Sequence, residues 1–536
     1  MNAQASALSV RHLALRLPAG GDRRHALEDL SFELPQKEIL CIVGESGSGK
    51  SLCAQALMGL LPRAIKVDGG AALFDGADLL HLAPAQMRAL RGRRIAMIFQ
   101  EPMTALNPAM RIGDQIAEMF EAHGLLTPAE RRERVLALAR EVRLPDPERI
   151  VRAFPHQISG GQRQRAMIAM ALALEPALLI ADEPTTALDV TTQAQILHLI
   201  RELQQTRSMA VVFITHDFGV VADIADRVLV LQKGIVVEEG TAERVLKSPQ
   251  HPYTKALLAA VPKAAPEPRP PADPRPVALA VSHLDKWYRP RGLFADARHV
   301  HALKDVSFEL RRGETLGLVG ESGSGKSTVA RVVTRIDDPD SGEIRLGGED
   351  FSAMRGEALR VARSRIQMVF QDPYASLNPR RRVGLSIADG PMAQGVPRAE
   401  ALKAARKLLE TVGLDPRAAD RLPHEFSGGQ RQRIGIARAL ALEPDVLVAD
   451  EAVSALDVTV QAQVLKLLAE LKARLDLAML FITHDLNVAG QICDRLAVMR
   501  RGEIVEIAPT AEIFAAPKHE YTRELLAAIP GRTGTS

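Results

Sequence analysis

The chain of 536 residues contains one ordered set of short segments twice. The first occurrences are LEDLSFEL at 27–34, GESGSGKS at 44–51, SGGQRQR at 159–165 and ITHD at 214–217; the second are LKDVSFEL at 303–310, GESGSGKS at 320–327, SGGQRQR at 427–433 and ITHD at 482–485. From SGGQ onward each landmark lies 268 residues after its counterpart (159 to 427, 216 to 484). So long a period predicts two copies of one domain, not a solenoid of short repeats.

A proline-rich stretch separates the two copies. PKAAPEPRPPADPRP at 262–276 has seven prolines, which exclude a helix or an interior strand. The alternative, a buried irregular loop, would leave backbone polar groups without partners. The sequence therefore predicts a first domain at 1–261, an extended linker at 262–277 and a second domain at 278–536.

The composition is that of a globular protein and excludes several functional classes. Hydrophobic residues make up 46% and charged residues 25%, and the net charge is only +3, which argues against disorder and against a strongly basic nucleic-acid binder. Aromatic residues make up 4%, too few for base-stacking platforms. The three cysteines are too scattered for a disulfide framework or a zinc site. We find neither a membrane-spanning apolar run nor a signal peptide, so we expect a cytosolic protein.

Short apolar runs alternate with stretches of helical periodicity. In the first copy the sequence predicts strands at 39–43, 178–181 and 211–214, and helices at about 51–61, 162–174 and 190–203. Such alternation indicates an α/β fold with a parallel core. The stretches at 113–154 and 384–425 show no strand pattern and are predicted to be helical insertions.

A glycine-rich loop between strand and helix predicts phosphate binding. Both GESGSGKS segments match G-x-x-x-x-G-K-[ST], in which backbone N–H groups surround a phosphate, the lysine contacts β and γ oxygens, and the serine binds Mg²⁺. The candidate residues of the first loop are Gly44, Ser46, Gly47, Gly49, Lys50 and Ser51. Those of the second are Gly320, Ser322, Gly323, Gly325, Lys326 and Ser327.

An acidic pair follows a buried strand in each copy. Asp182-Glu183 and Asp450-Glu451 each follow four apolar residues. The aspartate is placed to support Mg²⁺, and the glutamate to polarise an attacking water as a general base. Alone, such a pair is usually a strand ending at solvent; after a phosphate loop, in both copies, the catalytic interpretation is favoured.

The SGGQ segments predict a second anion-binding element in each copy. Each opens a predicted helix with serine as N-cap and two glycines that expose backbone N–H groups. In isolation, a capped turn is the simpler interpretation. The candidate residues are Ser159, Gly160, Gly161 and Gln162, and in the second copy Ser427, Gly428, Gly429 and Gln430.

The order of these motifs resembles the nucleotide-binding domain of ATP-binding cassette (ABC) transporters, twice and over nearly the whole chain. The resemblance implies P-loop NTPase domains, each with a RecA-like parallel-sheet core, an antiparallel β subdomain and a helical subdomain. It also implies that two such domains pack head to tail around two molecules of ATP with Mg²⁺.

The resemblance assigns residues to two composite ATP sites. Site one would use Lys50, Ser51, Gln100, Asp182, Glu183 and His216, closed by Ser427, Gly428, Gly429 and Gln430. Site two would use Lys326, Ser327, Gln371, Asp450, Glu451 and His484, closed by Ser159, Gly160, Gly161 and Gln162. The glutamines would sense Mg²⁺ and the histidines would contact the γ-phosphate, although a lone histidine after a strand is more often structural.

Two positions depart from the family pattern. The family places an aromatic residue before the phosphate loop to stack on adenine; the second copy offers Tyr288, whereas the first has Leu15-Arg16-Leu17. The second copy also has Ala452 where the first has Pro184, and we expect this to loosen the turn slightly. Because both carboxylate pairs remain, we expect two hydrolytic sites.

Further segments resemble the ATPases of dipeptide and oligopeptide importers. These segments are QEPMTALNP at 100–108, QDPYASLNP at 371–379, HPYT at 251–254 and HEYT at 519–522. The resemblance implies two permease subunits and an extracytoplasmic solute-binding protein as partners, no nucleic acid, and a peripheral position at the cytoplasmic face of the inner membrane. Two alternatives remain: a soluble paired-cassette ATPase acting on ribosomes, and an exporter ATPase.

Overall fold

The computed structural model describes residues 6–18, 20, 23–186, 188–261, 275–288, 299–372, 376–454 and 456–531. The chain divides into two compact units: the first comprises residues 1–188, 192–261 and 530–536, and the second comprises 189–191 and 262–529. Most of the predicted linker lies outside the described residues, and β11 begins at its last residue, Val277. The domain boundaries therefore stay predictions.

Each unit contains a mainly parallel six-stranded sheet and an antiparallel four-stranded sheet. In the first unit the six-stranded order is β10-β9-β3-β8-β7-β6, with only β9 and β10 antiparallel, and the four-stranded order is β2-β1-β4-β5. The six strands are β3 (Ile39–Val43), β6 (Ile95–Ile98), β7 (Leu178–Asp182), β8 (Ala210–Ile214), β9 (Arg227–Gln232) and β10 (Ile235–Thr241). The other four are β1 (Ser6–Arg16), β2 (His25–Pro35), β4 (Lys66–Phe74) and β5 (Ala77–Asp78).

The second unit repeats this topology, with orders β16-β17-β18-β13-β19-β20 and β12-β11-β14-β15. Its six-stranded sheet consists of β13 (Thr315–Val319), β16 (Ile366–Val369), β17 (Val446–Asp450), β18 (Ala478–Thr483), β19 (Arg495–Arg500) and β20 (Glu503–Pro509). Its antiparallel strands are β11 (Val277–Tyr288), β12 (Val300–Arg311), β14 (Ser341–Leu346) and β15 (Glu349–Asp350). The predicted α/β fold with parallel core and antiparallel subdomain is confirmed in both units.

Helices make up the remaining elements of each unit. Within the described residues, the two predicted helical insertions, 113–154 and 384–425, contain no strand. The first unit has α1 (Lys50–Leu57), α2 (Pro84–Leu90), α3 (Pro102–Ala105), α4 (Ile112–Ala122), α5 (Pro128–Glu141), α6 (Pro147–Ile150), α7 (Gly160–Leu172), α8 (Val190–Thr206), α9 (Phe218–Ile224), α10 (Ala242–Lys247) and α11 (Pro252–Ala260). The second has α12 (Lys326–Val333), α13 (Gly356–Ser364), α14 (Val383–Ala393), α15 (Arg398–Thr411), α16 (Gly428–Leu440), α17 (Val458–Leu475), α18 (Leu486–Ile492), α19 (Thr510–Ala515) and α20 (Glu520–Ala527).

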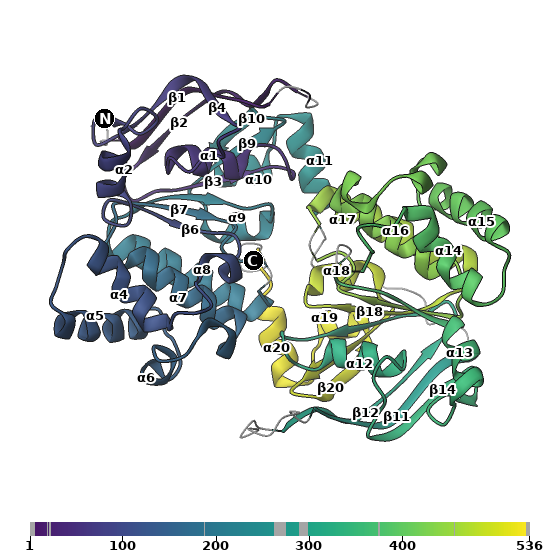
Figure 1. Ribbon diagram of the computed structural model, residues 1–536. Helices are drawn as coiled ribbons and strands as arrows, with labels where there is room; N and C mark the ends of the chain where they lie inside the picture. The colour runs from purple at the N-terminus through teal and green to yellow at the C-terminus, as the bar shows by residue number, and fades with distance from the viewer. Residues whose placement is uncertain are drawn as a thin grey trace. The chain divides into compact units, whose positions relative to one another are not determined.

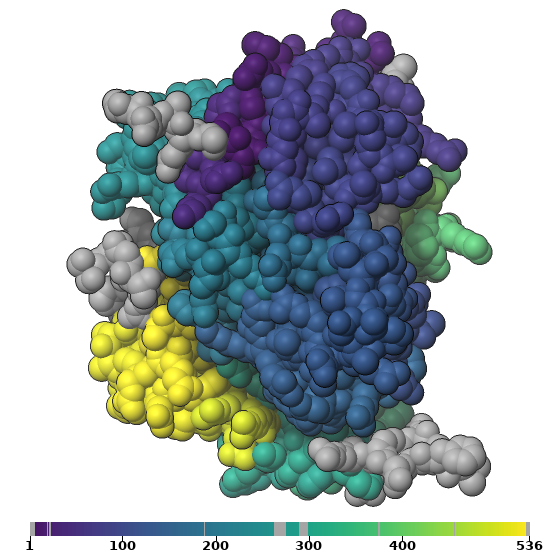
Figure 2. Space-filling view, turned by 90° about the vertical axis from the view of Figure 1, so that its left-hand side faces the viewer, coloured from purple at the N-terminus to yellow at the C-terminus, as the bar shows by residue number. Residues whose placement is uncertain are grey.

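The six-stranded sheet lies between two hydrophobic cores. In β3, Ile39, Cys41 and Val43 pack into the core shared with the helical segment, whereas Leu40 and Ile42 pack into the core shared with the antiparallel sheet. Burial on both faces explains why the strand is a continuous apolar run. Figure 1 shows α4, α5 and α6 on the opposite side of this sheet from β1, β2 and β4. In the space-filling view of Figure 2, the purple N-terminal part of the first unit lies at the top and the blue helical segment adjoins it from below.

The helix after the phosphate loop is shorter than predicted. It was expected at about 51–61, but α1 ends at Leu57. Gly59 follows with a φ of +62°, a left-handed conformation that stops the helix. The predicted C-terminal end was therefore wrong, because a glycine near the end of a helical pattern can be either interior or cap.

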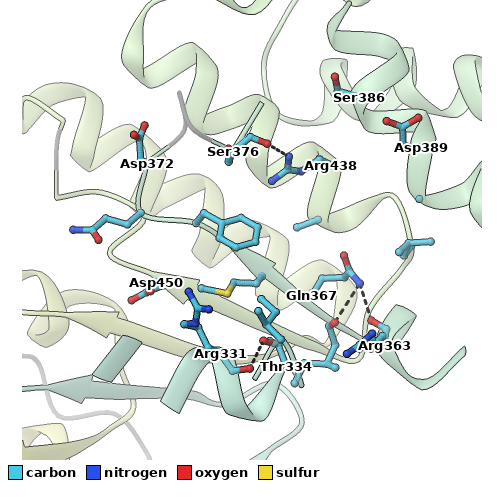
Figure 3. A pocket seen from close by; sticks show the side chains of 18 of the residues that line it. Arg331, Thr334, Arg363, Gln367, Asp372, Ser376, Ser386, Asp389, Arg438 and Asp450 are labelled. Atoms are coloured by element: carbon cyan, nitrogen blue, oxygen red, sulfur yellow. Dashed lines mark hydrogen bonds between the residues drawn. The ribbon is translucent and has the colours of Figure 1, made fainter. Parts of the chain in front are cut away.

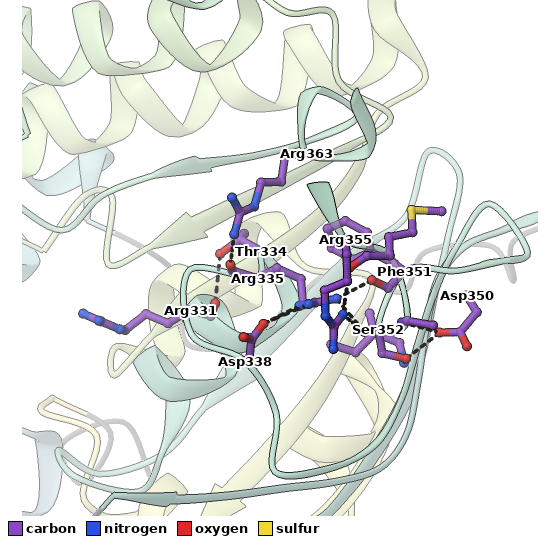
Figure 4. A network of polar contacts seen from close by, with 12 residues as sticks. Arg331, Thr334, Arg335, Asp338, Asp350, Phe351, Ser352, Arg355 and Arg363 are labelled. Carbon is purple, nitrogen blue, oxygen red and sulfur yellow. Dashed lines mark hydrogen bonds and ion pairs between the residues drawn. The ribbon is translucent and has the colours of Figure 1, made fainter. Parts of the chain in front are cut away.

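The same position in the second unit carries a buried arginine. Arg335 has a φ of +57° and is 1% exposed. Its guanidinium donates hydrogen bonds to the Ser352 carbonyl at 2.8 Å and to Asp338 Oδ1 at 2.8 and 3.0 Å (Figure 4). It also donates to the Phe351 carbonyl, and Arg363 donates to the carbonyl of Arg335. These contacts join the end of α12 to the segment that follows β15.

Among the described residues, no helix is both long enough and apolar enough to cross a membrane.

Candidate functional site

The phosphate loop follows β3 directly, and its glycines are required by close backbone contacts. Gly44 has a φ of +151°, and a Cβ there would lie 2.2 Å from the Leu231 carbonyl oxygen. Gly49 has a φ of +106°, and a Cβ there would lie 2.7 Å from the Ala26 carbonyl oxygen. Only glycine fits both constraints. The matching glycines of the second unit are Gly320 (φ +152°) and Gly325 (φ +110°).

Each loop lysine is buried against its own loop. Lys50 is 5% exposed, and its ammonium donates to the carbonyls of Gly44 at 2.7 Å and Glu45 at 2.9 Å. In the second unit, Lys326 donates to Gly320 and Glu321, both at 2.7 Å. The ammonium groups are therefore held inside the loops, where the sequence predicts the phosphates.

The predicted serine and aspartate meet in each unit. Ser51 Oγ lies 3.1 Å from Asp182 Oδ1, and Ser327 Oγ lies 3.2 Å from Asp450 Oδ1. Burial, together with the charge of the adjacent glutamate, raises the pKa of Asp182 to about 6 despite the hydrogen bond from Ser51. The donor atoms are all hard oxygens, and a buried carboxylate favours a nearby cation, so these residues fit a Mg²⁺ ion.

The predicted catalytic glutamate contacts three side chains in the first unit. Glu183 Oε2 accepts from Gln100 Nε2 at 3.0 Å and from Thr186 Oγ1 at 2.9 Å, and lies 3.3 Å from His216 Nδ1. Burial alone would raise the pKa of Glu183, but the hydrogen bond and charge of His216 and the Thr186 hydroxyl lower it to about 2. The contact with Glu183 raises the pKa of His216, although burial opposes the shift.

The second unit repeats this cluster. Gln371 Nε2 donates to Glu451 Oε2 at 2.6 Å, and His484 Nδ1 lies 3.3 Å from Glu451 Oε1. The pKa of Glu451 is lowered, because the hydrogen bond and charge of His484 outweigh the effect of burial. The glutamate has the same left-handed φ in both units, +45° at Glu183 and +46° at Glu451, although Ala452 replaces proline.

Each SGGQ segment forms the capped start of a helix, as predicted. Ser159 Oγ accepts from the Gln162 backbone N–H at 3.3 Å, and Gln162 Oε1 accepts from the Ser159 N–H at 3.0 Å. A Cβ at Gly161 would lie 2.6 Å from Thr192 Cγ2. Ser427 and Gln430 make the same reciprocal pair. The binding of a nucleotide by these segments stays a prediction.

Tyr288, the predicted adenine-stacking residue, lies at the end of β11. Its ring is partly exposed, and its hydroxyl donates to Asp337 Oδ2 at 2.7 Å. The first unit instead brings Arg23 to the phosphate loop, where the guanidinium donates to the Gly47 carbonyl. Nothing in the sequence around Arg23 pointed to this contact, because the segment matches no motif.

Two tyrosines, one in each unit, contact the phosphate loops although the motifs did not predict it. The backbone N–H of Glu45, in the first phosphate loop, donates to Tyr253 Oη at 3.2 Å, and that of Glu321 donates to Tyr521 Oη at 3.1 Å. Both tyrosines belong to the HPYT and HEYT segments, which we had used only as a sign of the subfamily.

The comparison with protein families matches both halves of the chain. The pattern of the family described as "ABC transporter" matches residues 27–186 and 303–454, which hold both phosphate loops and both acidic pairs. The chain belongs to the ABC transporter family. It is therefore an ATP-binding protein and an ATPase of the ABC type, as the sequence predicts. A second pattern, "Oligopeptide/dipeptide transporter, C-terminal region", matches residues 237–291 and 505–535 of this ABC protein.

Similar proteins are known over nearly the full length of this ABC ATPase. It is 48% identical to the "Glutathione import ATP-binding protein GsiA" of Escherichia coli O157:H7, over 98% of this chain and 89% of that protein. It is 49% identical to the "Peptidoglycan transport ATP-binding protein YejF" of Agrobacterium fabrum (strain C58 / ATCC 33970), over 97% of this chain and 96% of that protein. A solved dimer of the ATP-binding cassette MJ0796 in a post-hydrolysis state is 28% identical, covering 44% of this chain and 98% of that one, with a TM-score of 0.40.

Proposed function

We propose that this ABC ATPase energises the import of peptides or peptide-like solutes across the bacterial inner membrane. The observation that carries the proposal is the match of both C-terminal segments, 237–291 and 505–535, to the oligopeptide/dipeptide transporter region. The relatives named for glutathione import and peptidoglycan transport support the same class of solute.

The proposed ATP sites use the residue clusters described above. Lys50 and Lys326 contact the phosphates, and Glu183 and Glu451 orient and deprotonate the attacking water. His216 and His484 contact the γ-phosphate. A Mg²⁺ ion bound by Ser51, Gln100 and Asp182, or by Ser327, Gln371 and Asp450, would neutralise charge on the phosphates. The family organisation would close each site with SGGQ of the other copy: Ser427, Gly428, Gly429 and Gln430 for site one, and Ser159, Gly160, Gly161 and Gln162 for site two.

His216 Nδ1 lies 3.3 Å from Oε2 of Glu183, the carboxylate that would act on water. An ionised Glu183 with a pKa of about 2 is a weak base while the histidine is bound to it. A γ-phosphate that binds His216 would release Glu183 and raise its basicity. The arrangement thus links the strength of the base to the presence of nucleotide.

A groove beside the predicted Mg²⁺-sensing glutamine of the second unit supports a permease partner. It has a volume of about 1240 Å³ (Figure 3). Arg331, Thr334 and Arg363 line it from α12, α13 and their ends, and Asp389 and Arg438 line it from the helical segment. Phe370, beside Gln371, is 39% exposed. A groove that joins the catalytic core to the helical segment and exposes an aromatic ring is suited to hold a helix of another subunit.

The matching stretch of the first unit also exposes apolar side chains. Phe99 is 41% exposed and Met103 is 58% exposed, on either side of Gln100. We therefore propose two permease subunits, one for each unit, and through them an extracytoplasmic solute-binding protein. The chain itself would be peripheral to the cytoplasmic face of the membrane.

Uptake measurements test the proposal directly. Cells that lack this chain, complemented with wild type or with the Glu183→Gln/Glu451→Gln variant, would be given labelled glutathione or a labelled muropeptide. We expect binding-protein-dependent uptake of a peptide-like solute only with wild type. Mass spectrometry of the ligand carried by the cognate solute-binding protein would identify the solute.

Fractionation separates the two alternative functions. Membrane association that is lost when the permeases are deleted supports import. Co-sedimentation with ribosomes would instead identify a soluble paired-cassette ATPase, and loss of efflux without loss of uptake would identify an exporter ATPase.

A further inference from the structure

A tyrosine hydroxyl from the C-terminal helix of each unit contacts the phosphate loop. Tyr253 lies in the first turn of α11 and accepts from the Glu45 N–H at 3.2 Å, and Tyr521 of α20 accepts from the Glu321 N–H at 3.1 Å. The partners lie 208 and 200 residues apart in the sequence. The contact is thus kept in both units although the chain between the partners differs in length.

The start of the helix is fixed so that the tyrosine ring meets the loop. His251 Nδ1 accepts from the Tyr253 backbone N–H at 3.2 Å. The carboxylate of Glu238, on β10, accepts from the N–H groups of Gln250 at 2.8 Å and His251 at 3.1 Å. The second unit has the same arrangement at His519, Glu506 and Lys518. The neighbouring strand therefore holds the first turn of the helix.

The tyrosine and the loop lysine hold opposite ends of one peptide group. The N–H of Glu45 and the carbonyl of Gly44 belong to the same planar, trans peptide, so they point in opposite directions. The N–H donates to Tyr253, and the carbonyl accepts from the Lys50 ammonium at 2.7 Å. Rotating this peptide would break both contacts together.

We propose that Tyr253 and Tyr521 are positioning residues, which orient the peptide that holds the phosphate-loop lysine. They act through the peptide group and not by touching nucleotide. The inference rests on the proposed ATP sites. The proposal gives a role in ATP binding to the region that matches oligopeptide transporters. Its tyrosine would hold the loop lysine in the position from which it contacts the phosphates.

The tyrosine is more deeply buried in the second unit than in the first. Tyr521 is 1% exposed, and the Arg500 guanidinium carbon lies 4.6 Å from its ring centroid. The first unit has Gln232 at the corresponding end of its strand. Burial raises the pKa of Tyr521 to about 12, so its hydroxyl stays neutral at neutral pH. Glu45 and Glu321 are both half-buried, but Tyr521 is more buried than Tyr253, so water is less able to replace its hydroxyl. We therefore expect the loss of the Tyr521 hydroxyl to have the larger effect.

The test removes one oxygen atom at a time from the full-length protein. Tyr253→Phe, Tyr521→Phe and the double variant would be compared by hydrogen–deuterium exchange of the phosphate-loop peptides without nucleotide, and by kcat and KM for ATP. We expect faster exchange at the loop of the altered unit. For the double variant we expect a rise in the KM for ATP of about fivefold, the effect of one hydrogen bond, with little change in Tm.

Leu257→Ala is the matched control, because it removes buried packing from α11 and keeps the hydroxyl. It should lower Tm and leave loop exchange and KM as in wild type. The inference is overturned if the double Phe variant matches wild type in exchange and KM, or if Leu257→Ala changes both as strongly. Failure of the proposed function would look different: wild type would support no uptake of a peptide-like solute, whereas the exchange experiment and the KM for ATP do not depend on transport.

Discussion

At the scale of single residues, the chemistry of each unit centres on a glutamate with a left-handed backbone. Glu183 and Glu451 adopt φ values of +45° and +46°, which cost of order 1 kcal/mol for a residue with a Cβ. Both units keep this conformation, and it brings the carboxylate to a glutamine and a histidine. The sequence predicted the glutamate, the glutamine and the histidine, because each belongs to a motif with a fixed order and spacing. It could not predict Arg23 or the tyrosine hydroxyls, because those contacts join distant segments that only the fold brings together.

Replacement of each glutamate tests whether both sites hydrolyse ATP. Glu183→Gln and Glu451→Gln keep the side-chain shape and remove the base, so we expect each to lower kcat and the double variant to lower it by about 10² to 10⁴. Steady-state phosphate release would measure this. Two equal sites would be ruled out if Glu183→Gln left turnover intact while Glu451→Gln abolished it.

At the scale of elements, the helix that follows the phosphate loop is stopped by different residues in the two units. The first ends α1 with Gly59, whose carbonyl accepts from Arg91 at 2.9 Å, whereas the second places Arg335 at the same point. The parallel core and helical segments were predictable from apolar periodicity and duplication. The end of α1 was not predictable, because the helix stops where Gly59 adopts a left-handed backbone conformation, and apolar periodicity does not indicate backbone conformation.

Arg335→Gly would give the second unit the residue of the first. The change relieves the left-handed strain, but it leaves the buried Phe351 carbonyl without its Arg335 donor and leaves the Ser352 carbonyl with Arg355 alone. We expect the free energy of unfolding to fall by about 2 kcal/mol, because each lost bond to a charged group outweighs the relief. Calorimetry would measure the free energy of unfolding. Arg335→Lys keeps the charge, so its stability should fall between those of wild type and Arg335→Gly. An unchanged or more stable Gly variant would contradict the role of the network.

Glu238 links stability to pH through the cap of α11. Burial alone would raise its pKa, but the hydrogen bonds that its carboxylate accepts lower it below the ordinary 4.5. A lowered pKa stabilises the fold above pH 4.5, and that contribution is lost as the pH falls. We expect wild type to be more stable than Glu238→Gln at pH 7 and the difference to shrink below pH 4.5, as followed by thermal unfolding.

At the scale of the whole molecule, two copies of one domain in one chain make the proposed composite sites testable by cross-linking. The native thiols, Cys41, Cys53 and Cys493, are buried, and burial raises the pKa of Cys53 to about 12, so they should react slowly. An engineered pair can therefore be oxidised selectively.

We expect Ser46→Cys with Gly428→Cys to form an ATP-dependent disulfide in the Glu183→Gln/Glu451→Gln background. Non-reducing electrophoresis would detect the cross-linked chain by its altered migration. The pair Ser46→Cys with Gly160→Cys, which uses the SGGQ segment of the same copy, should not cross-link. The reverse result would mean that each pocket is complete within its own copy.

The alternating packing of β3 has a consequence for how this chain can change over time. Its five residues alternate between two cores, and the phosphate loop begins at the next residue. Deleting one residue of β3 would exchange the two faces and also pull the loop one residue back. Insertions and deletions should therefore be purged from this strand during evolution and accumulate in the loops that lie before SGGQ, where the two copies already differ in length.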